Sequence, residues 1–184
     1  MDVILLPGLG NSGPDHWQSH WERLHPAFRR LEQREWDSPD CGEWVATLDA
    51  YLRLARRPVV LAAHSSACAA VARWASAART SQAATVGGAL LVAPTDPDGA
   101  LYPKGPTGFG PVAMSRLPFP SIVVASDTDP YVTPTQAARY ARAWGSTYFL
   151  LPNAGHINAA SGHGPWPLGL ELLSMFRVSP KCPV

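Results

Sequence analysis

The segment from Val59 to Val71 constrains the fold most, because it requires a strand to turn directly into a helix. It begins as an apolar, β-branched run and continues through small residues into an alanine-rich segment of high helix propensity. Ser65 lies at the turn, with Ala63 two residues before it and Ala67 two residues after it. Such a turn, usually written G-x-S-x-G, is a nucleophile elbow, which exposes a serine hydroxyl where strand and helix approach each other.

Two alternatives to Ser65 as a nucleophile follow from the same residues. Ser65 can be a buried serine at a helix N-cap, since a small-x-Ser-x-small sequence arises by chance in an alanine-rich chain. Ser66 can be the nucleophile instead, but it is flanked by His64 and Cys68, which are bulkier than the crossing of strand and helix tolerates. Ser65 is therefore the better candidate, and the amide of Ser66, at the first turn of the helix, is suited to binding an oxyanion.

Composition and charge exclude several classes of protein. The 184 residues suffice for a full hydrophobic core, and we expect residues 1–184 to form a single domain. The formal net charge of +1, without a basic block, gives no reason to expect nucleic acid or an anionic membrane as a partner.

The three cysteines, Cys41, Cys68 and Cys182, have neither paired nor metal-ligand spacing. We therefore expect reduced thiols in a cytoplasmic protein, with no metal and no cofactor. The sequence has no signal-peptide pattern and no apolar run long enough for a membrane span, so we expect neither export nor membrane insertion. The oligomeric state is left open.

Strand-like and helix-like segments alternate along the chain. Short apolar runs predict strands, and amphipathic or alanine-rich segments predict helices between them. The expected strands are 3–6, 30–36, 58–63, 86–93, 121–125 and 147–151. The expected helices are 15–25, 43–55, 66–78, 136–144 and 168–176. This alternation predicts a three-layer α/β/α sandwich with a mostly parallel sheet of about six strands.

A glycine-rich loop, Gly8-Leu9-Gly10, follows the first expected strand. It lacks the third glycine of a dinucleotide fingerprint and the Gly-Lys-Ser/Thr of a nucleotide-binding loop, which disfavours phosphate binding. In a hydrolase sheet the corresponding loop donates the second oxyanion amide. We expect Leu9 to be that donor, with Gly10 as the alternative.

Region 94–120 is rich in proline and glycine, and a long irregular stretch in a compact domain is usually functional or mobile. It is too short for a helical cap domain, so we expect a loop at the rim of the site. Three of its apolar residues are candidates either for pocket walls or for cover of the core: Tyr102, Phe109 and Met114.

Residues suited to nucleophilic catalysis follow three of the expected strands. Ser65 follows the third strand, Asp127 and Asp129 follow the fifth, and His156 follows the sixth. The carboxyl ends of parallel strands meet at one edge of a sheet, where ligands bind. The chain order Ser, Asp, His is that of an α/β-hydrolase triad, in which an imidazole takes the serine proton and a carboxylate orients the imidazole.

Each of the two partners has a rival. His156 is favoured over His163 because it follows the last strand directly, after a glycine. Asp129 is favoured over Asp127 because its spacing from the strand end to the next helix fits the hydrolase pattern, whereas Asp127 fits a turn former or helper. The remaining histidines are expected at the surface, at the core edge or in local contacts: His16, His20, His25 and His64.

Motifs spread over nearly the full chain carry a resemblance to a known family. They are Pro7-Gly8-x-Gly10-Asn11 with His16-Trp17, Ala63-His64-Ser65, Ser126-x-x-Asp129-Pro130-Tyr131-Val132, and Gly155-His156-Ile157-Asn158 with Ser161-Gly162-x-Gly164-x-Trp166-Pro167. The chain resembles the small serine hydrolase family that includes retinoblastoma-binding protein 9 and the YdeN-like bacterial proteins. The resemblance implies a reduced α/β-hydrolase fold without a cap domain, a triad of Ser65, Asp129 and His156, and hydrolysis of esters or related acyl compounds.

The chain departs from this family at two places. The family commonly has Leu-Gly after the nucleophile, whereas Ser66-Ala67 follows here and adds a methyl group where strand and helix cross. In the namesake, binding of pocket proteins is associated with an L-x-C-x-E motif; the nearest match here has Pro39 in place of Leu, so that activity is not carried over. Two hypotheses remain: a serine hydrolase acting on small acyl substrates through an acyl-enzyme, or a non-catalytic binding protein that retains the fold.

Overall fold

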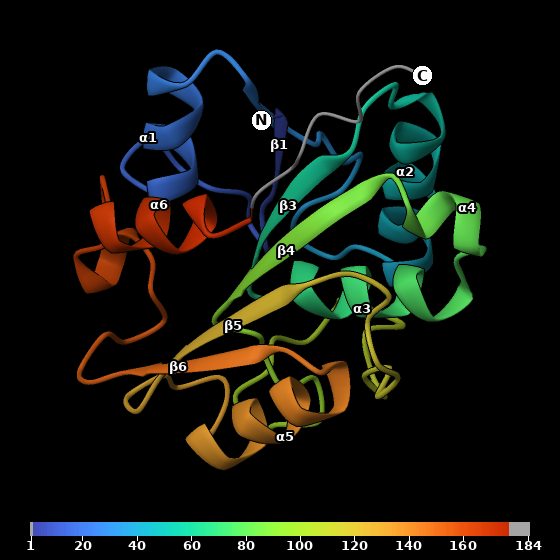
Figure 1. Cartoon of the computed structure of the whole chain (residues 1–184). Coiled ribbons are helices and arrows are strands. Elements are labelled where there is room, and N and C mark those ends of the chain that lie inside the picture. Colours follow the sequence, from blue (N-terminus) through green and yellow to red (C-terminus); the bar gives the residue numbers. More distant parts are fainter. Residues whose placement is uncertain (1, 177–184) are drawn as a thin grey trace.

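The computed structural model describes residues 2–176, which form a twisted sheet with helices on both faces (Figure 1). All strand pairs are parallel, and the strand order is β2-β1-β3-β4-β5-β6. The strands are β1 Asp2–Leu6, β2 Phe28–Arg30, β3 Val59–His64, β4 Val86–Val92, β5 Ser121–Ser126 and β6 Thr147–Leu151. The predicted three-layer sandwich with a sheet of about six strands is confirmed.

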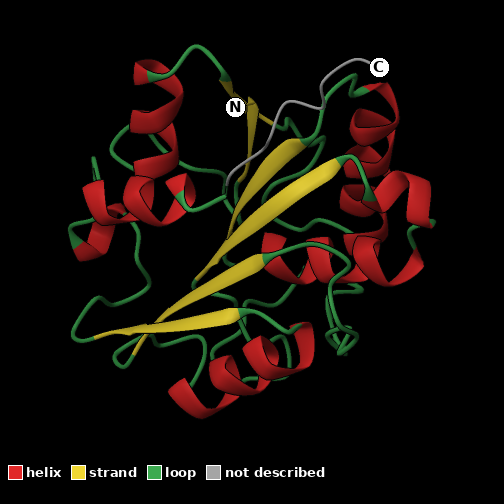
Figure 2. Cartoon of the chain, in the orientation of Figure 1, coloured by secondary structure: helices red, strands yellow, loops and turns green. Residues whose placement is uncertain are grey.

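Helices connect most of the successive strands, a last helix follows β6, and together they cover the two faces of the sheet (Figure 2). They are α1 Trp17–Leu24, α2 Cys41–Leu54, α3 Ala67–Ala77, α4 Thr80–Ala83, α5 Pro134–Trp144 and α6 Pro167–Ser174, with a 3-10 turn at Ala159–Ser161. The predicted cap and end of α5 are present: the Thr133 hydroxyl accepts a hydrogen bond from Gln136 N, and Gly145 is left-handed with φ +70°. None of the helices in the described part of the chain has the length and apolar character needed to cross a bilayer.

Successive residues of the central strands point into two separate cores. In β1, Ile4 and Leu6 belong to the core that also contains residues of α2, α3 and α5, whereas Val3 and Leu5 belong to the core that contains residues of α1 and α6. This alternation follows from the two-residue period of a strand, and burial on both faces explains why the strand sequences are continuously apolar. The helices therefore hold the sheet rigidly from both sides.

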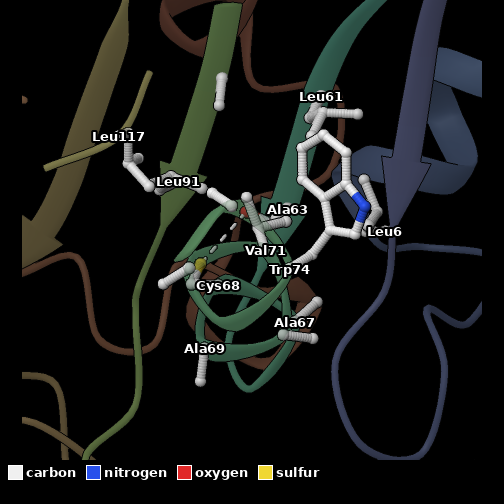
Figure 3. Packing of buried hydrophobic residues seen from close by; sticks show 14 of the residues in the cluster. Leu6, Leu61, Ala63, Ala67, Cys68, Ala69, Val71, Trp74, Leu91 and Leu117 are labelled. Atoms are coloured by element: carbon white, nitrogen blue, oxygen red, sulfur yellow. Dashed lines mark hydrogen bonds between the residues drawn. The ribbon is translucent and has the colours of Figure 1, made fainter. Parts of the chain in front are cut away.

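Helix α3 packs closely on β3 and β4 through a face that is mostly alanine, with Val71 and Trp74 as its larger side chains. Val71 and Trp74 of α3 lie against Leu61 and Leu91 of the sheet (Figure 3). The Cys68 thiol lies at the start of this face, 3.6 Å from the carbonyl oxygen of Ala63. Cys41 and Cys68 are buried free thiols, and Cys182 lies outside the described residues.

The expected strand at 30–36 is wrong. Strand β2 pairs with β1 only from Phe28 to Arg30, and after Leu31 the chain leaves the sheet. The Glu35 carboxylate accepts bonds from the amides of Asp37 and Ser38, which forms a turn in place of a strand. Helix α4 was not expected, since four residues are too few for a periodic signal.

Region 94–120 contains no helix or strand of the sheet in the described structure, in agreement with the expected rim loop. Its middle is attached to the start of α2: Thr107 Oγ1 donates to the Asp40 carboxylate at 2.9 Å, and Cys41 N donates to the Thr107 carbonyl at 2.9 Å. Phe109 is buried against Trp44, at a centroid distance of 5.3 Å, so it covers the core.

Candidate active site

Ser65 lies between the end of β3 and the start of α3, at the predicted turn. Its φ angle is +58°, in the left-handed region that non-glycine residues rarely adopt. Ser65 N donates to the Val92 carbonyl of β4 at 2.9 Å, which holds the turn against the sheet. Ala63 and Ala67 are fully buried on either side, so strand and helix cross with alanine at both small positions. The backbone geometry is that of a nucleophile elbow.

A continuous chain of hydrogen bonds joins the three residues that the sequence singled out. His156 Nε2 lies 3.0 Å from Ser65 Oγ, and His156 Nδ1 lies 3.0 and 2.9 Å from the two carboxylate oxygens of Asp129. Tyr131 N also donates to Asp129, at 2.9 Å. Because Nδ1–H donates to the carboxylate, Nε2 is left as an acceptor for the serine proton.

The rival residues lie elsewhere. His163 Nδ1 lies 3.2 Å from Ser161 Oγ, and Ser66 Oγ contacts the hydroxyls of Thr95 and Tyr102 at 3.2 Å each. The structure gives neither His163 nor Ser66 a hydrogen bond to the chain that joins Ser65, His156 and Asp129.

Asp127 has a different role: it belongs to a three-point clamp between the loops that carry Asp129 and His156. The side chains of Asp127, Ser126 and Thr128 accept bonds, in that order, from the three successive amides of residues 153, 154 and 155 after β6. The three distances are 3.0, 2.7 and 3.1 Å for Ser126, Asp127 and Thr128. The clamp holds the loop after β5 to the loop after β6, so the helper role expected for Asp127 matches its position.

Two backbone amides near Ser65 are available to an oxyanion. Neither Leu9 N nor Ser66 N donates to an acceptor among the described residues, whereas Gly10 N donates to the Trp36 carbonyl at 2.8 Å. Leu9 and Ser66 both line the cavity above Ser65. This contact of Gly10 with Trp36 separates the two alternatives that the sequence left open, and it leaves Leu9 as the available donor.

Gly8 allows the loop between β1 and α1 to approach Ser65. A Cβ at position 8 would lie 2.6 Å from Ser65 Cβ and 3.1 Å from the His64 carbonyl oxygen. Both distances are shorter than ordinary contacts, and neither neighbour can move, because one is backbone and the other is fixed in the elbow. Only glycine fits there. We call residues 7–16 the Gly8 loop.

Buried polar contacts fix the Gly8 loop to the sheet. The Gln18 side chain, 0 % exposed, donates to one carbonyl of β1 and one of β3 at 3.1 and 3.0 Å, and it accepts from Ser12 Oγ at 2.6 Å. Arg30 donates to Asn11 Oδ1 at 2.7 Å and to the Ser12 carbonyl at 2.9 Å. The loop is thus held at its backbone and at its side chains.

His16 and His64 lie beside the candidate base His156, and the sequence did not indicate this proximity. His64 Nε2 donates to the backbone carbonyl of His156 at 2.9 Å, and the His16 ring lies 4.7 Å from the His64 ring. Burial, with a smaller contribution from Arg30, lowers the pKa of His16 to about 3, and burial lowers the pKa of His64 well below its usual value. Both rings are therefore neutral at ordinary pH.

The expectation that His16 belongs to the surface or core edge is wrong: it is only 6 % exposed, and it lines the cavity above Ser65. Its Nδ1 accepts from Gln18 N at 3.2 Å and caps α1. The available signal was its place directly before an amphipathic helix, where a side chain able to accept a hydrogen bond is favoured. Its proximity to the elbow depends on how α1 packs.

A cavity of about 240 Å³ lies above Ser65. Tyr102 is the one of the three candidates from region 94–120 that lines it; Phe109 is in the core, and Met114 is 38 % exposed away from it. Sequence reasoning missed several other lining residues, namely Asn11, Thr95, Tyr131 and Asn158. Within residues 2–176, no group of three or more His, Cys, Asp or Glu side chains is arranged to hold a metal ion.

Comparison with known proteins gives the same fold. Residues 3–175 match the model of the family described as serine hydrolase. A protein from Pectobacterium atrosepticum described as a YdeN-like hydrolase is 35% identical, with a TM-score of 0.81 over 95% of this chain and 89% of that one. No curated protein is similar enough in sequence to match the chain.

Two further solved structures are more distant in sequence. The ydeN gene product of B. subtilis is 20% identical, with a TM-score of 0.73 over 95% of this chain and 97% of that one. Esterase 2 of Thermogutta terrifontis is 16% identical, with a TM-score of 0.65 over 97% of this chain and 84% of that one. With an α/β-hydrolase fold and a family match over nearly its full length, the chain belongs to the serine hydrolase family and is a hydrolase.

Proposed function

We propose that the protein hydrolyses esters of short carboxylic acids through an acyl-enzyme intermediate on Ser65. The observation that carries this proposal is the chain of hydrogen bonds from Ser65 Oγ through His156 to the Asp129 carboxylate. A serine hydroxyl is a weak nucleophile until an adjacent base removes its proton, and this arrangement provides that base with its orienting group.

In the first half of the reaction, Ser65 Oγ attacks the ester carbonyl and its proton passes to His156 Nε2. The carbonyl oxygen becomes an oxyanion, to which the amides of Leu9 and Ser66 donate. Asp129 keeps the proton on Nδ1 and stabilises the imidazolium. The C–O bond of the ester then breaks, the alcohol takes the proton from Nε2, and the acyl group stays on Ser65.

In the second half, a water molecule replaces the alcohol and gives a proton to His156 Nε2 as it attacks the acyl-enzyme. The second tetrahedral intermediate uses the same two amides. When it collapses, Ser65 Oγ takes the proton back and the carboxylic acid leaves. Because the His16 and His64 rings are neutral, they do not repel the imidazolium of His156, and the Asp129 carboxylate stabilises it.

The substrate class rests on the size of the cavity and on a structural neighbour. A volume of about 240 Å³ lies below the roughly 300–1,000 Å³ of sites for drug-sized ligands, which favours short acyl groups. Esterase 2 of T. terrifontis shares the fold and is a precedent for ester substrates on it. We therefore place the activity among the carboxylesterases.

A fluorophosphonate probe tests the nucleophile directly, because it forms a covalent bond only with an activated serine. We expect labelling of the wild-type protein and of Ser66→Ala, which keeps the amide, and no labelling of Ser65→Ala. The labelled peptide is identified by mass spectrometry. No labelling of the wild type, together with no turnover of p-nitrophenyl acetate or butyrate, would refute the enzymatic proposal in favour of a non-catalytic binding protein.

A further inference from the structure

The proposed reaction divides the cavity into two sides, and the inference below rests on that function. The leaving alcohol must take its proton from His156 Nε2, so it occupies the side of the cavity next to His156. The acyl group remains on Ser65 and extends away from His156. Ser66, Thr95 and Tyr102 line the cavity without a hydrogen bond to His156, and on this ground they are assigned to the acyl side.

Three hydroxyl groups meet on this acyl side. Ser66 Oγ lies 3.2 Å from Thr95 Oγ1 and 3.2 Å from the Tyr102 hydroxyl. They come from two segments: Ser66 belongs to the elbow, and Thr95 and Tyr102 belong to the 94–120 loop. Ser66 is 0 % exposed and Thr95 is 4 % exposed, so two of the three are removed from bulk solvent.

The three hydroxyl groups have one more hydrogen than the contacts between them can use. Three hydroxyls carry three hydrogens, and the two contacts that join them use two. The third hydrogen has no other acceptor among the described residues, whichever way the chain of bonds runs. Burial raises the pKa of Tyr102, so the phenol keeps its proton at ordinary pH and the count holds.

An apolar acyl group would therefore leave a hydroxyl hydrogen without an acceptor once it displaced water from the site. An unpaired buried donor is costly, whereas an acyl group with a hydroxyl substituent accepts that hydrogen and can donate in return. We propose that Ser66, Thr95 and Tyr102 form a polar acyl subsite, which selects esters of short hydroxy acids over esters of alkanoic acids of the same size.

Pairs of p-nitrophenyl esters that differ only by a hydroxyl in place of a methyl group test this subsite. The pairs are lactate with isobutyrate, and 3-hydroxybutyrate with 3-methylbutyrate. The value of kcat/KM for each ester is divided by its rate of alkaline hydrolysis, which removes differences in intrinsic reactivity. For at least one pair we expect the wild-type protein to favour the hydroxy ester about tenfold, the effect of one neutral hydrogen bond.

Two isosteric variants assign the preference to the named hydroxyls. Thr95→Val and Tyr102→Phe should each bring the ratio of hydroxy to methyl ester close to one, and the ratio is measured within one variant, so it is independent of overall activity. Tyr148→Phe is the matched control, because its hydroxyl donates to the Pro134 carbonyl, outside the cavity. It should keep the wild-type ratio.

The outcomes separate this inference from the proposed function. A wild-type ratio near one in both pairs, with Ser65 still labelled by a fluorophosphonate, overturns the subsite and leaves the hydrolase proposal standing. A preference that persists in both Thr95→Val and Tyr102→Phe overturns the assignment to these hydroxyls. Absence of Ser65 labelling overturns the hydrolase proposal and the subsite together. The wild-type measurement needs no variant to fold.

Discussion

The two sides of the cavity above Ser65 are held in place by different kinds of interaction. The Gly8 loop is fixed by buried and partly buried polar contacts: Gln18 joins Ser12 of the loop to two strand carbonyls, and Arg30 bonds to the loop itself. The 94–120 loop is attached instead at separate points along its length, by the packing of Phe109, by the contacts of Thr107 and by bonds to α5 such as that from Trp144 Nε1 to the Ala113 carbonyl.

The difference matches the task of each side. The side proposed to hold an oxyanion donor has buried hydrogen bonds, which are directional and are costly to break. The side proposed to contact the acyl group is a long loop held at separate points, and loops tolerate change more readily. We therefore expect substitutions near the Gly8 loop and the strand ends to affect rate, and substitutions in the 94–120 loop to affect selectivity.

The largest effect is expected at the residues just after the strand ends, which lie between the two sides of the cavity. His156→Ala removes the base, and kcat should fall about 10⁴-fold or more with little change in KM. The measurement is steady-state hydrolysis of p-nitrophenyl butyrate. His163→Ala is the matched control, since its ring contacts Ser161 and not Ser65, and it should keep most of the activity. Equal losses in the two variants would contradict the assignment.

The next largest effect tests the close approach of the Gly8 loop. Gly8→Ala places a Cβ 2.6 Å from Ser65 Cβ, so the loop must move and the Leu9 amide with it. Loss of one oxyanion donor lowers kcat about 10²–10³-fold, and we expect a fall of that size. Gly13→Ala in the same loop is the control, because no atom lies within 4 Å of its added Cβ. Full activity of Gly8→Ala would show that the loop is not held as described.

A third effect concerns the buried histidine of the Gly8 loop. The folded-state pKa of His16 is about 3, below the value of 6.5 expected in the unfolded chain. Between these values the unfolded state binds a proton that the folded state does not, so the free energy of unfolding decreases as the pH falls from about 6.5 towards 3. His16→Asn keeps a capping side chain and removes this titration.

Denaturant unfolding at pH 6, 5 and 4 measures this effect. The fall in the free energy of unfolding should be smaller in His16→Asn than in the wild type, by about 1.4 kcal/mol per pH unit for one proton. His20→Asn, on the same helix and only partly buried, serves as the comparison and should follow the wild type. If the free energy of unfolding falls equally with pH in all three proteins, burial does not hold the pKa of His16 down.

The smallest effect is expected in the 94–120 loop. Thr107→Val removes the exposed hydrogen bond to Asp40 but keeps the backbone bonds on both sides of Thr107. The free energy of unfolding, measured by thermal denaturation, should change by less than about 1 kcal/mol, and kcat for p-nitrophenyl butyrate should stay within twofold of wild type. A loss of activity comparable to that of Gly8→Ala would remove the distinction between the two sides.

The parts of the site that follow from local sequence were predictable. The elbow needs only a strand, a serine between small residues and a helix, and all of these are adjacent in the chain. Asp129 and His156 follow from a general rule of parallel sheets, because both lie just beyond strand ends. The position of the edge strand was not predictable, because its pairing runs only from Phe28 to Arg30 and is too short to give a sequence pattern.

The remaining features depend on contacts between distant residues. The sequence does not show whether Leu9 or Gly10 has the free amide, and the bond from Gly10 N to the Trp36 carbonyl distinguishes them. Likewise, Tyr102 reaches the cavity and Phe109 the core because the loop between them is attached to residues near position 40. Such contacts leave no signature in the neighbouring sequence.

The clamp formed by Ser126, Asp127 and Thr128 has a kinetic consequence. Since it fastens the loops bearing Asp129 and His156 to each other, the carboxylate and the imidazole drift together when the sheet edge fluctuates. Ser65 belongs to a different segment, which is tied to the His156 loop by the bond from His64 Nε2 to the His156 carbonyl. Because the loops of Asp129 and His156 share three bonds, we expect the distance between hydroxyl and imidazole to vary more than the distance between imidazole and carboxylate.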